Sequence, residues 1–364
     1  VSAVDISGGK GFLSKVFKVT IEFDNKDPYN VVLKVPGMEA FTESLSKTDV
    51  LKDQDFTKNT QITTLHNKEC EFYRKYASTI NIPLPKIYKI QEITKEQPGA
   101  ILMECLVGKA DSCHLTVGVN LQQIFEVVRH LATLQSHFLC LPPESWIGKY
   151  VFGTTLNGFV ESNYLGNFFT VLKTMKPGEF DEGIEAFGKY SKNVKFFRYA
   201  MCDVYKEAGL PVGISHGDFW NNNMMYKLDS DGKISNEIAA IIDWQVFHEG
   251  SMIYDLAKFL ALCVDGELRR EHEAEILQYY YDTLVNLMEK KGRNVDFTAE
   301  QLTKAYRSHC VFQAMIAMTA APFMITCGQW KRDEGADRFF HRAKLAMEDA
   351  LERLKELPEE ILEV

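Results

Sequence analysis

Alternating hydrophobic and polar residues near the start of the chain predict β-structure. Residues 17–23 alternate with a period of two, and residues 31–35 form a mostly apolar run. The segment between them is rich in Asp, Asn and Pro, which is typical of the turn of an antiparallel hairpin. A helix is expected over 66–78, because prolines follow it, and two short strands are expected over 87–93 and 100–104.

After residue 104 the pattern changes to a helical period. The segments predicted to be helical are 119–138, 192–208, 253–264, 267–290, 299–318 and 332–354. One β-like island, residues 214–242, interrupts them, and residues 139–191 show no clear period and stay unassigned. We therefore predict an α+β chain, with a small β-rich N-terminal part over 1–106 and a large, mainly helical part over 107–364.

Length and charge narrow the class of protein. The 364 residues leave room for two or three domains, or for two lobes that share a cleft. Lys and Arg number 41 against 50 Asp and Glu, which gives a net charge of −9. A surface that binds a nucleic acid backbone usually carries a basic excess, so nucleic acid is not the expected partner.

The cysteines and the apolar runs bear on the expected cellular location of the protein. The eight cysteines include no Cys-x-x-Cys pair, and we expect reduced thiols in a cytoplasmic protein. The longest apolar stretch, 311–325, is shorter than the ~20 residues that span a bilayer, so no membrane span is expected. The chain begins at Val1 and not at Met, so we expect that residues precede it, and a targeting segment there would not be visible.

Polar side chains cluster beside the apolar residues of the β-like island. Asp218 precedes Asn223 by five residues, and Asp243 follows the next predicted strand. Phosphoryl transfer needs a carboxylate at the attacking hydroxyl and oxygen ligands that hold Mg²⁺ against the phosphates. Asp218 is the candidate catalytic base or hydroxyl-orienting group, and Asn223 and Asp243 are the candidate metal ligands. The alternative is a polar turn between two strands.

The motifs around these residues resemble those of a known superfamily. His216-Gly217-Asp218, followed by Asn223, is similar to the catalytic loop of aminoglycoside phosphotransferases and choline kinases, and Asp243 in Ile-Asp-Trp is similar to their metal-binding aspartate. The run HGDFWNNNMMY most resembles the CHK-type, or ecdysteroid kinase-like, branch, which includes uncharacterised nematode proteins.

This resemblance implies a protein-kinase-like bilobal fold. Residues 1–106 would form the nucleotide-binding lobe and 107–364 the catalytic and acceptor-binding lobe. It also implies that the chain transfers the γ-phosphoryl group of ATP, with Mg²⁺, to a hydroxyl of a small molecule. The alternatives are a catalytically silent nucleotide- or lipid-binding protein on the same fold and a protein kinase.

The resemblance extends to residues of the N-terminal part. Gly8, Gly9 and Gly11 match a glycine-containing nucleotide loop, in which the backbone can approach phosphates. Lys34 matches the lysine that contacts the α- and β-phosphates, and an acidic residue of the following helix would orient it. Glu69 is favoured for that role, and its alternative Glu71 lies ~200° away around the helix, so only one of the two can face the lysine.

Other positions are implied less directly. Met103, Glu104 and Cys105 resemble the hinge that binds adenine through backbone groups. Asp255 matches an aspartate that braces the catalytic loop, and His216 is expected to support that loop rather than act as a base. The sequence does not choose the acceptor. Aromatic residues that could hold a quaternary amine or a flat apolar ring, or could simply be core, are Tyr279, Tyr280, Tyr281, Phe312, Trp330, Phe339 and Phe340.

Two departures from the superfamily limit the expected activity. The helix after the hinge reads Leu131 to Gln135 where many relatives carry a histidine at the last position, which weakens any transfer of substrate identity. An Ala-Pro-Glu element is missing after Asp243, so control by an activation loop is not expected.

Overall fold

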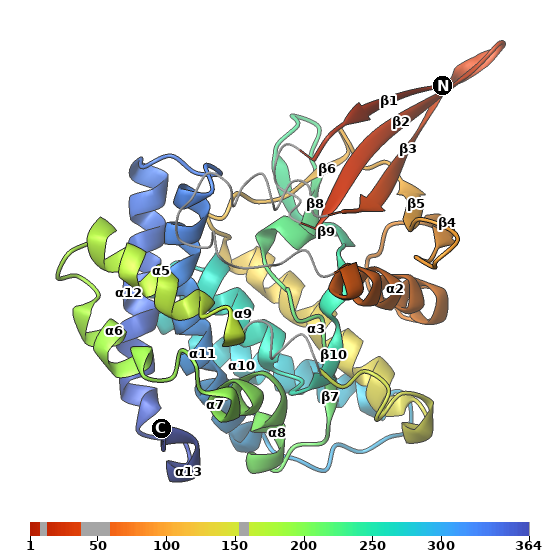
Figure 1. The fold of residues 1–364 in the computed structure, drawn as a ribbon. Helices are drawn as coiled ribbons and strands as arrows, with labels where there is room; N and C mark the ends of the chain where they lie inside the picture. Colours follow the sequence, from red (N-terminus) through yellow and green to blue (C-terminus); the bar gives the residue numbers. More distant parts are fainter. Residues whose placement is uncertain (8–12, 38–58, 153–159, 364) are drawn as a thin grey trace.

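The protein is described from a computed structural model, which places residues 1–7, 13–37, 59–152 and 160–363 (Figure 1). The strands are β1 (Ser2–Asp5), β2 (Ser14–Phe23), β3 (Lys26–Pro36), β4 (Ile87–Gln91), β5 (Ala100–Glu104), β6 (Ala110–Asp111), β7 (Gly213–Ser215), β8 (Met224–Leu228), β9 (Ile234–Ile241) and β10 (His248–Gly250). The α-helices are α2 (Asn59–Tyr76), α3 (Leu121–Cys140), α5 (Tyr164–Met175), α6 (Asp181–Gly188), α7 (Val194–Arg198), α8 (Val204–Glu207), α9 (Tyr254–Cys263), α10 (Gly266–Glu289), α11 (Ala299–Thr326), α12 (Glu334–Leu354) and α13 (Glu359–Leu362). Short 3₁₀ or π turns are η1 (Pro143–Ser145), η2 (Tyr199–Asp203), η3 (Asn221–Asn223) and η4 (Trp244–Val246).

An antiparallel five-stranded sheet forms the N-terminal part, in the order β1-β2-β3-β5-β4. The central strand β3 pairs with β2 on one side and β5 on the other, so Lys34 lies opposite Val16 and Ile101. The β-branched residues of β2 and β3 suit this half-buried, pleated surface. Helix α2 lies alongside β4 below the sheet (Figure 1). A lysine on a central strand is therefore held in a rigid frame.

The C-terminal part is mainly helical, and α11 runs through its core. Helix α11 begins at a capping box formed by Thr298 and Gln301 and packs against α5, α9 and α12. It is long and apolar enough to cross a membrane, but 72% of its apolar window is buried inside the protein, as in the core helix of a globular domain. The predicted buried helix over 311–325 is thus part of α11.

Two small sheets are formed by strands of the C-terminal part. Strand β10 pairs with β7, and β6, β8 and β9 form a three-stranded antiparallel sheet. In the β8–β9 pair Met224 lies opposite Ile241, and the N–H of Ile242 donates to the carbonyl oxygen of Asn223 at 2.9 Å. This register brings the end of the predicted catalytic loop directly against the residue that precedes Asp243.

The predicted α+β organisation is confirmed, and the differences lie in element boundaries. Helix α2 begins seven residues before the predicted start, and α11 continues through Pro322 to Thr326, because its last turns are packed in the core. The segment 192–208 is not one regular helix, because the π turn η2 separates α7 from α8. The unassigned segment 139–191 contains α5 and α6. The division of the chain at residue 106 stays a prediction, since the elements alone do not define independent domains.

Candidate active site

Lys34 is bound by two carboxylates that come from distant segments. Its Nζ lies 2.7 Å from Oε2 of Glu69 on α2 and 2.5 Å from Oδ1 of Asp243. Burial alone would lower the pKa of Lys34, but Asp243 and Glu69 raise it well above its ordinary value. Lys34 is therefore a fixed cation. Burial raises the pKa of Glu69 to about 7, against the opposing effect of the lysine.

The structure places Glu69, and not Glu71, against Lys34. The side chain of Glu69 is 1% exposed, whereas that of Glu71 is 34% exposed and forms an ion pair with Lys75, one helical turn away. The hydroxyl of Tyr150 also donates to Glu71. The two glutamates face opposite sides of α2, as the helical period requires.

An aromatic stack fixes α2 to the segment that carries Asp243. The rings of Phe72 and Trp244 are parallel, with centroids 3.8 Å apart and an interplanar angle of 6°, and both side chains are fully buried. Phe72 lies three residues after Glu69, and Trp244 directly follows Asp243. The stack therefore holds both carboxylates that contact Lys34 in one unit. Asp243 itself has a left-handed backbone, with φ 69° and ψ 56°, which is uncommon for a non-glycine residue.

A tight turn forms the start of the predicted catalytic loop. Gly217 has φ +84°, and a Cβ atom there would lie 2.6 Å from the carbonyl oxygen of Val246. Both carboxylate oxygens of the buried Asp255 accept from the loop backbone, from the N–H of His216 at 2.6 Å and from that of Gly217 at 3.0 Å. Burial raises the pKa of Asp255 to about 6, although these two bonds oppose the shift. Asp255 occupies the bracing position that the resemblance implies.

His216 supports the loop from below. Its Nδ1 accepts from the backbone N–H of Asp218 at 3.3 Å, so Nε2 carries the proton and donates to the carbonyl oxygen of Ile242 at 3.0 Å. Burial lowers the pKa of His216 to about 4, so the ring is neutral at pH 7. Both ring nitrogens are used in holding backbone groups, which matches the structural role predicted for this histidine.

Asp218 is held by three side chains. Its Oδ1 accepts from Lys258 Nζ at 2.6 Å, and its Oδ2 accepts from Trp220 Nε1 and Asn223 Nδ2, each at 3.1 Å. Burial alone would raise the pKa of Asp218, but the charge and hydrogen bond of Lys258 outweigh burial and lower it. The carboxylate is therefore ionised and fixed in direction, with about a third of its side chain exposed. This state suits a group that orients a hydroxyl.

Lys258 is the part of this cluster that the sequence analysis missed. It lies on α9, three residues after Asp255, so both side chains project from one face of the helix toward the predicted catalytic loop. Only the spacing Asp255-x-x-Lys258 could have pointed to it, and that signal depends on knowing that Asp255 faces the loop. Burial would lower the pKa of Lys258, but Asp218 raises it above its ordinary value.

The predicted nucleotide positions are placed only in part. Met103 and Cys105 are buried at the end of β5, and the N–H of Glu104 donates to the carbonyl oxygen of Lys86 at 2.8 Å. Gly8, Gly9 and Gly11 lie outside the described residues. Leu13 and Ser14, which follow that segment, line a small cavity together with Lys34 and Glu69. The chain after the predicted glycine loop thus leads to the lysine.

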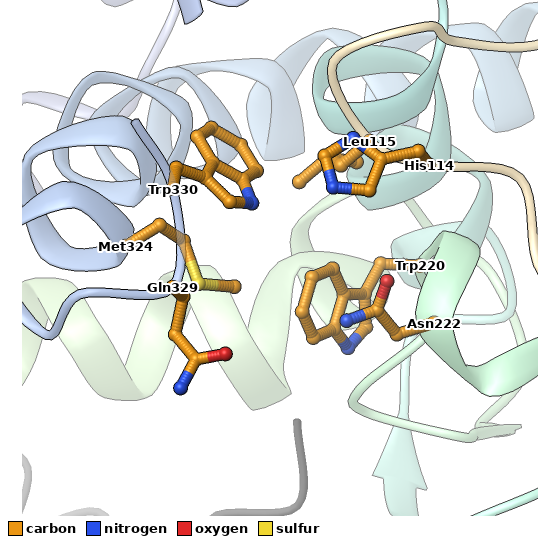
Figure 2. Close-up of a pocket in the computed structure, with 7 residues that line it drawn as sticks. All are labelled: His114, Leu115, Trp220, Asn222, Met324, Gln329 and Trp330. Carbon is orange, nitrogen blue, oxygen red and sulfur yellow. The ribbon is translucent and has the colours of Figure 1, made fainter. Parts of the chain in front are cut away.

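A second cavity, which is open to solvent, lies beside Asp218 (Figure 2). Trp330, Met324 and Gln329 face it from one side, and Trp220, Asn222, His114 and Leu115 face it from the other. Trp330 packs edge-on against Phe339, with ring centroids 5.2 Å apart. Of the aromatic residues named from the sequence, Trp330 is the one that lines this cavity, whereas Tyr280, Phe312 and Phe339 are fully buried core residues.

The predicted site residues therefore fall into two contacting groups. Lys34 joins Glu69 to Asp243, and Asn223 joins Asp218 to the strand that leads to Asp243. Among the described residues no group of three His, Cys, Asp or Glu side chains could hold a metal ion. A metal here would need an amide oxygen as one ligand and oxygens from outside the protein, which is the coordination Mg²⁺ accepts.

A family model described as "Uncharacterized oxidoreductase dhs-27" (DUF1679) matches residues 2–357. The chain is 28% identical over 316 residues to the "Uncharacterized oxidoreductase dhs-27" of Caenorhabditis elegans, covering 85% of this chain and 38% of that protein. It is 22% identical over 284 residues to the "Uncharacterized kinase-like protein D1044.1" of the same nematode, covering 78% of this chain and 71% of that protein. The chain thus spans little more than a third of the first relative.

Among solved structures, the chain is similar to a variant of aminoglycoside 2′-phosphotransferase-IIIa in complex with GDP. The TM-score is 0.50 at 14% identity, and the match covers 98% of this chain and 93% of that chain. At this identity the likeness concerns the fold alone. It confirms the protein-kinase-like fold predicted from the sequence motifs, with a sheet-containing N-terminal part and a mainly helical C-terminal part.

Proposed function

The chain belongs to the DUF1679 family, and from that premise we propose that it is an ATP-dependent phosphotransferase that moves the γ-phosphoryl group to a hydroxyl of a small molecule. The observation that carries the proposal is the meeting of Lys34, Asp218, Asn223 and Asp243, which come from segments far apart in the sequence. The alternative for Asp218 and Asp243 is a polar turn between strands. Such a turn does not require the buried Lys34, which comes from another sheet. The proposal includes membership of the CHK-type branch, on the strength of the run that contains Trp220.

On the nucleotide side, Lys34 binds the α- and β-phosphates. Its ammonium lies at the cavity that Leu13 and Ser14 line, and Glu69 holds it in place from α2. Because Lys34 also contacts Asp243, phosphate oxygens that bind the lysine lie next to that carboxylate. The adenine would bond to backbone groups near Glu104, at the opposite end of the β3–β5 ladder from Lys34.

Asn223 and Asp243 fit Mg²⁺ as its protein ligands. Nδ2 of Asn223 donates to both the carbonyl and the carboxylate of Asp218, and no described residue donates to its Oδ1, so this amide oxygen is available to a metal. Among the residues that the structure places, only Gln245 donates to Oδ2 of Asp243, in a long bond of 3.3 Å. Oxygen ligands of this kind are those Mg²⁺ prefers, and when bound it neutralises charge on the β- and γ-phosphates.

On the acceptor side, Asp218 orients the hydroxyl that attacks. The hydroxyl oxygen forms a bond to the γ-phosphorus while the bond from phosphorus to the β,γ-bridging oxygen breaks. The electron pair leaves with ADP, and the hydroxyl proton passes to Asp218 and then to solvent. Holding the reacting atoms in line, with little covalent chemistry by the protein, supplies most of the rate in such transfers.

The cavity of Figure 2 is where we place the body of the acceptor. Trp220 lines it and donates to Asp218, so an acceptor bound there lies beside the catalytic carboxylate. None of the described residues that line it is Asp, Glu, Lys or Arg. A polycationic acceptor would need carboxylates to offset its lost hydration. An acceptor with little charge and some apolar surface therefore fits this cavity better than an aminoglycoside does.

The oxidoreductase name of the first relative does not lead to a second candidate function. That name describes a protein of which this chain matches 38%, and the polar cluster described here has the groups for phosphoryl transfer. The cysteines are all free thiols, which suits a reducing compartment such as the cytoplasm, and we propose that location.

The proposal is tested by incubating the protein with γ-labelled ATP, Mg²⁺ and a methanol extract of Caenorhabditis elegans, with Asp218→Ala in parallel. We expect a labelled small molecule with the wild type and none with Asp218→Ala, while both proteins bind ATP. In a parallel incubation with a mixed protein acceptor, label that appears there and not in small molecules would indicate a protein kinase. Mg²⁺-dependent ATP binding without any transfer, in an extract in which a control kinase is active, would favour a silent nucleotide-binding protein.

A further inference from the structure

We propose that Lys258 is a second catalytic residue, whose ammonium contacts the acceptor hydroxyl and the phosphoryl group in transfer. This inference rests on the proposed phosphotransferase function and adds a residue that the sequence motifs do not contain. It is carried by the position of the lysine at Asp218 and by the hydrogen-bonding capacity that both groups retain.

The backbone of Lys258 belongs to a helix outside the catalytic loop, and its ammonium binds to that loop. Lys258 lies on α9, one turn after Asp255, whose two bonds fix the backbone of His216 and Gly217. Its Nζ donates to Oδ1 of Asp218 at 2.6 Å and to the carbonyl oxygen of Gly217 at 3.1 Å, and its side chain is 12% exposed. Helix α9 thus sets the backbone of the loop and the direction of the ammonium together.

One carboxylate oxygen of Asp218 can accept a further hydrogen bond. Oδ2 of Asp218 accepts from Trp220 and Asn223, whereas among the described residues only Lys258 donates to Oδ1. A carboxylate oxygen accepts about two hydrogen bonds, so an acceptor hydroxyl can still donate to Oδ1. The ammonium has three N–H groups, of which two are used among the described residues, so one remains for that hydroxyl or for a phosphoryl oxygen.

The negative charges of Asp218 and of the phosphoryl group explain why a cation is useful beside Asp218. The incoming phosphoryl group is anionic, and Asp218 is ionised, so the two repel each other as the O–P bond forms. An ammonium between them offsets both charges, and in a partly buried site its effect is much larger than in water. The hydroxyl oxygen forms the bond to phosphorus, ADP leaves with the electron pair, and the proton passes through Oδ1 of Asp218. Lys258 stays protonated throughout.

A structural role alone would predict something different. If Lys258 only neutralised Asp218, its loss would loosen the loop and weaken every function of the site together. If it contacts the transferring group, its loss reduces the rate at saturating ATP and leaves nucleotide affinity unchanged. The response to sulfur in place of a phosphoryl oxygen separates the two roles further, because sulfur is a poor acceptor for the compact ammonium.

The experiment compares wild type, Lys258→Met, Lys258→Arg and the control Lys227→Met, whose lysine pairs with Glu237 at the surface. The probes are γ-labelled ATP and ATPγS, each with Mg²⁺ and the methanol extract described above, and nucleotide affinity is measured by equilibrium binding. For Lys258→Met we expect the rate at saturating ATP to fall by about 10²–10³, as for loss of one transition-state donor. We expect Lys258→Arg to recover part of that loss and Lys227→Met to match the wild type.

Two results bear directly on contact with the phosphoryl group. ATP affinity of Lys258→Met should equal that of the wild type, and the ratio of the rates with ATP and ATPγS should be smaller in Lys258→Met than in the wild type. A variant that transfers at the wild-type rate, that loses ATP affinity in proportion to rate, or that keeps the wild-type ratio would overturn the inference. A wild type that transfers nothing would refute the proposed function, and this inference with it.

Discussion

The pairing of Lys34 with Glu69 can be tested with a control on the same helix. The perturbation is Glu69→Gln, which keeps the shape of the side chain and one acceptor oxygen but removes the charge. Glu71→Gln makes the same chemical change two residues away. The two glutamates differ mainly in where they point: Glu69 is 1% exposed and contacts Lys34 at 2.7 Å, whereas Glu71 is 34% exposed and pairs with Lys75.

The expected magnitudes follow from this difference in burial. A hydrogen bond to a charged group contributes about 1.5–3 kcal/mol, so Glu69→Gln should lower the free energy of unfolding by about that amount. Complete removal of one partner of a buried pair would cost more, about 3–5 kcal/mol, but here Asp243 still contacts Lys34. The exposed pair of Glu71 contributes about 0–1 kcal/mol, so Glu71→Gln should be close to the wild type.

The assay is urea unfolding at pH 8.5, above the pKa of about 7 that burial gives Glu69, followed by intrinsic fluorescence, together with ATP affinity. The midpoint should fall clearly for Glu69→Gln and hardly at all for Glu71→Gln. ATP affinity should fall only for Glu69→Gln, because its Lys34 can turn toward Asp243. Equal midpoints for the two variants, or the larger loss for Glu71→Gln, would show that the lysine is not oriented by Glu69 in solution.

Two further predictions concern the loop and the buried histidines. In urea unfolding, Gly217→Ala should lower the free energy of unfolding by more than Gly232→Ala. Both glycines have a positive φ, which costs an alanine about 1–2 kcal/mol, but a Cβ at Gly232 meets nothing within 4 Å, whereas one at Gly217 meets Val246. Equal losses in the two variants would contradict the close approach at Gly217. Burial lowers the pKa of His309 to about 3. Below pH 6.5 the unfolded chain therefore binds a proton that the folded protein does not, and the free energy of unfolding decreases as the pH is lowered. His309 should account for about 2 kcal/mol of the decrease in the free energy of unfolding between pH 7 and pH 5. In His309→Asn this decrease should be smaller by that amount. An unchanged decrease would show that His309 has an ordinary pKa in the folded protein.

Much of the fold could be predicted because its signals are local. Strand β5 was predicted with the observed bounds, and the start of α11 at Ala299 was also predicted. The start of α2 at Asn59 was missed, because the mostly polar residues before His66 show no hydrophobic period. The first turns of the helix extend a segment whose later turns are packed in the core. Helix α5 was missed although Leu165, Phe168, Phe169 and Leu172 recur at helical spacing and are buried.

The site shows the same division. The spacing of Asp218, Asn223 and Asp243 indicated phosphoryl transfer from the sequence, because these side chains lie within or beside one hairpin whose register follows from the strand pattern. Lys34 could be named only through the resemblance, since a lysine in a strand more often faces solvent. The choice of Glu69 over Glu71 was open, because a helix in isolation has no reason to turn either face toward the sheet.

What the sequence by itself determined about this protein is therefore local: which segments are strands or helices, and which short motifs carry carboxylates and amides at catalytic spacing. Only the tertiary structure decided the contacts between motifs. The stack of Phe72 on Trp244 turns Glu69 toward Lys34, and α9 brings Lys258 to Asp218. Packing of this kind depends on side chains that are distant in the chain, and so no local pattern records it.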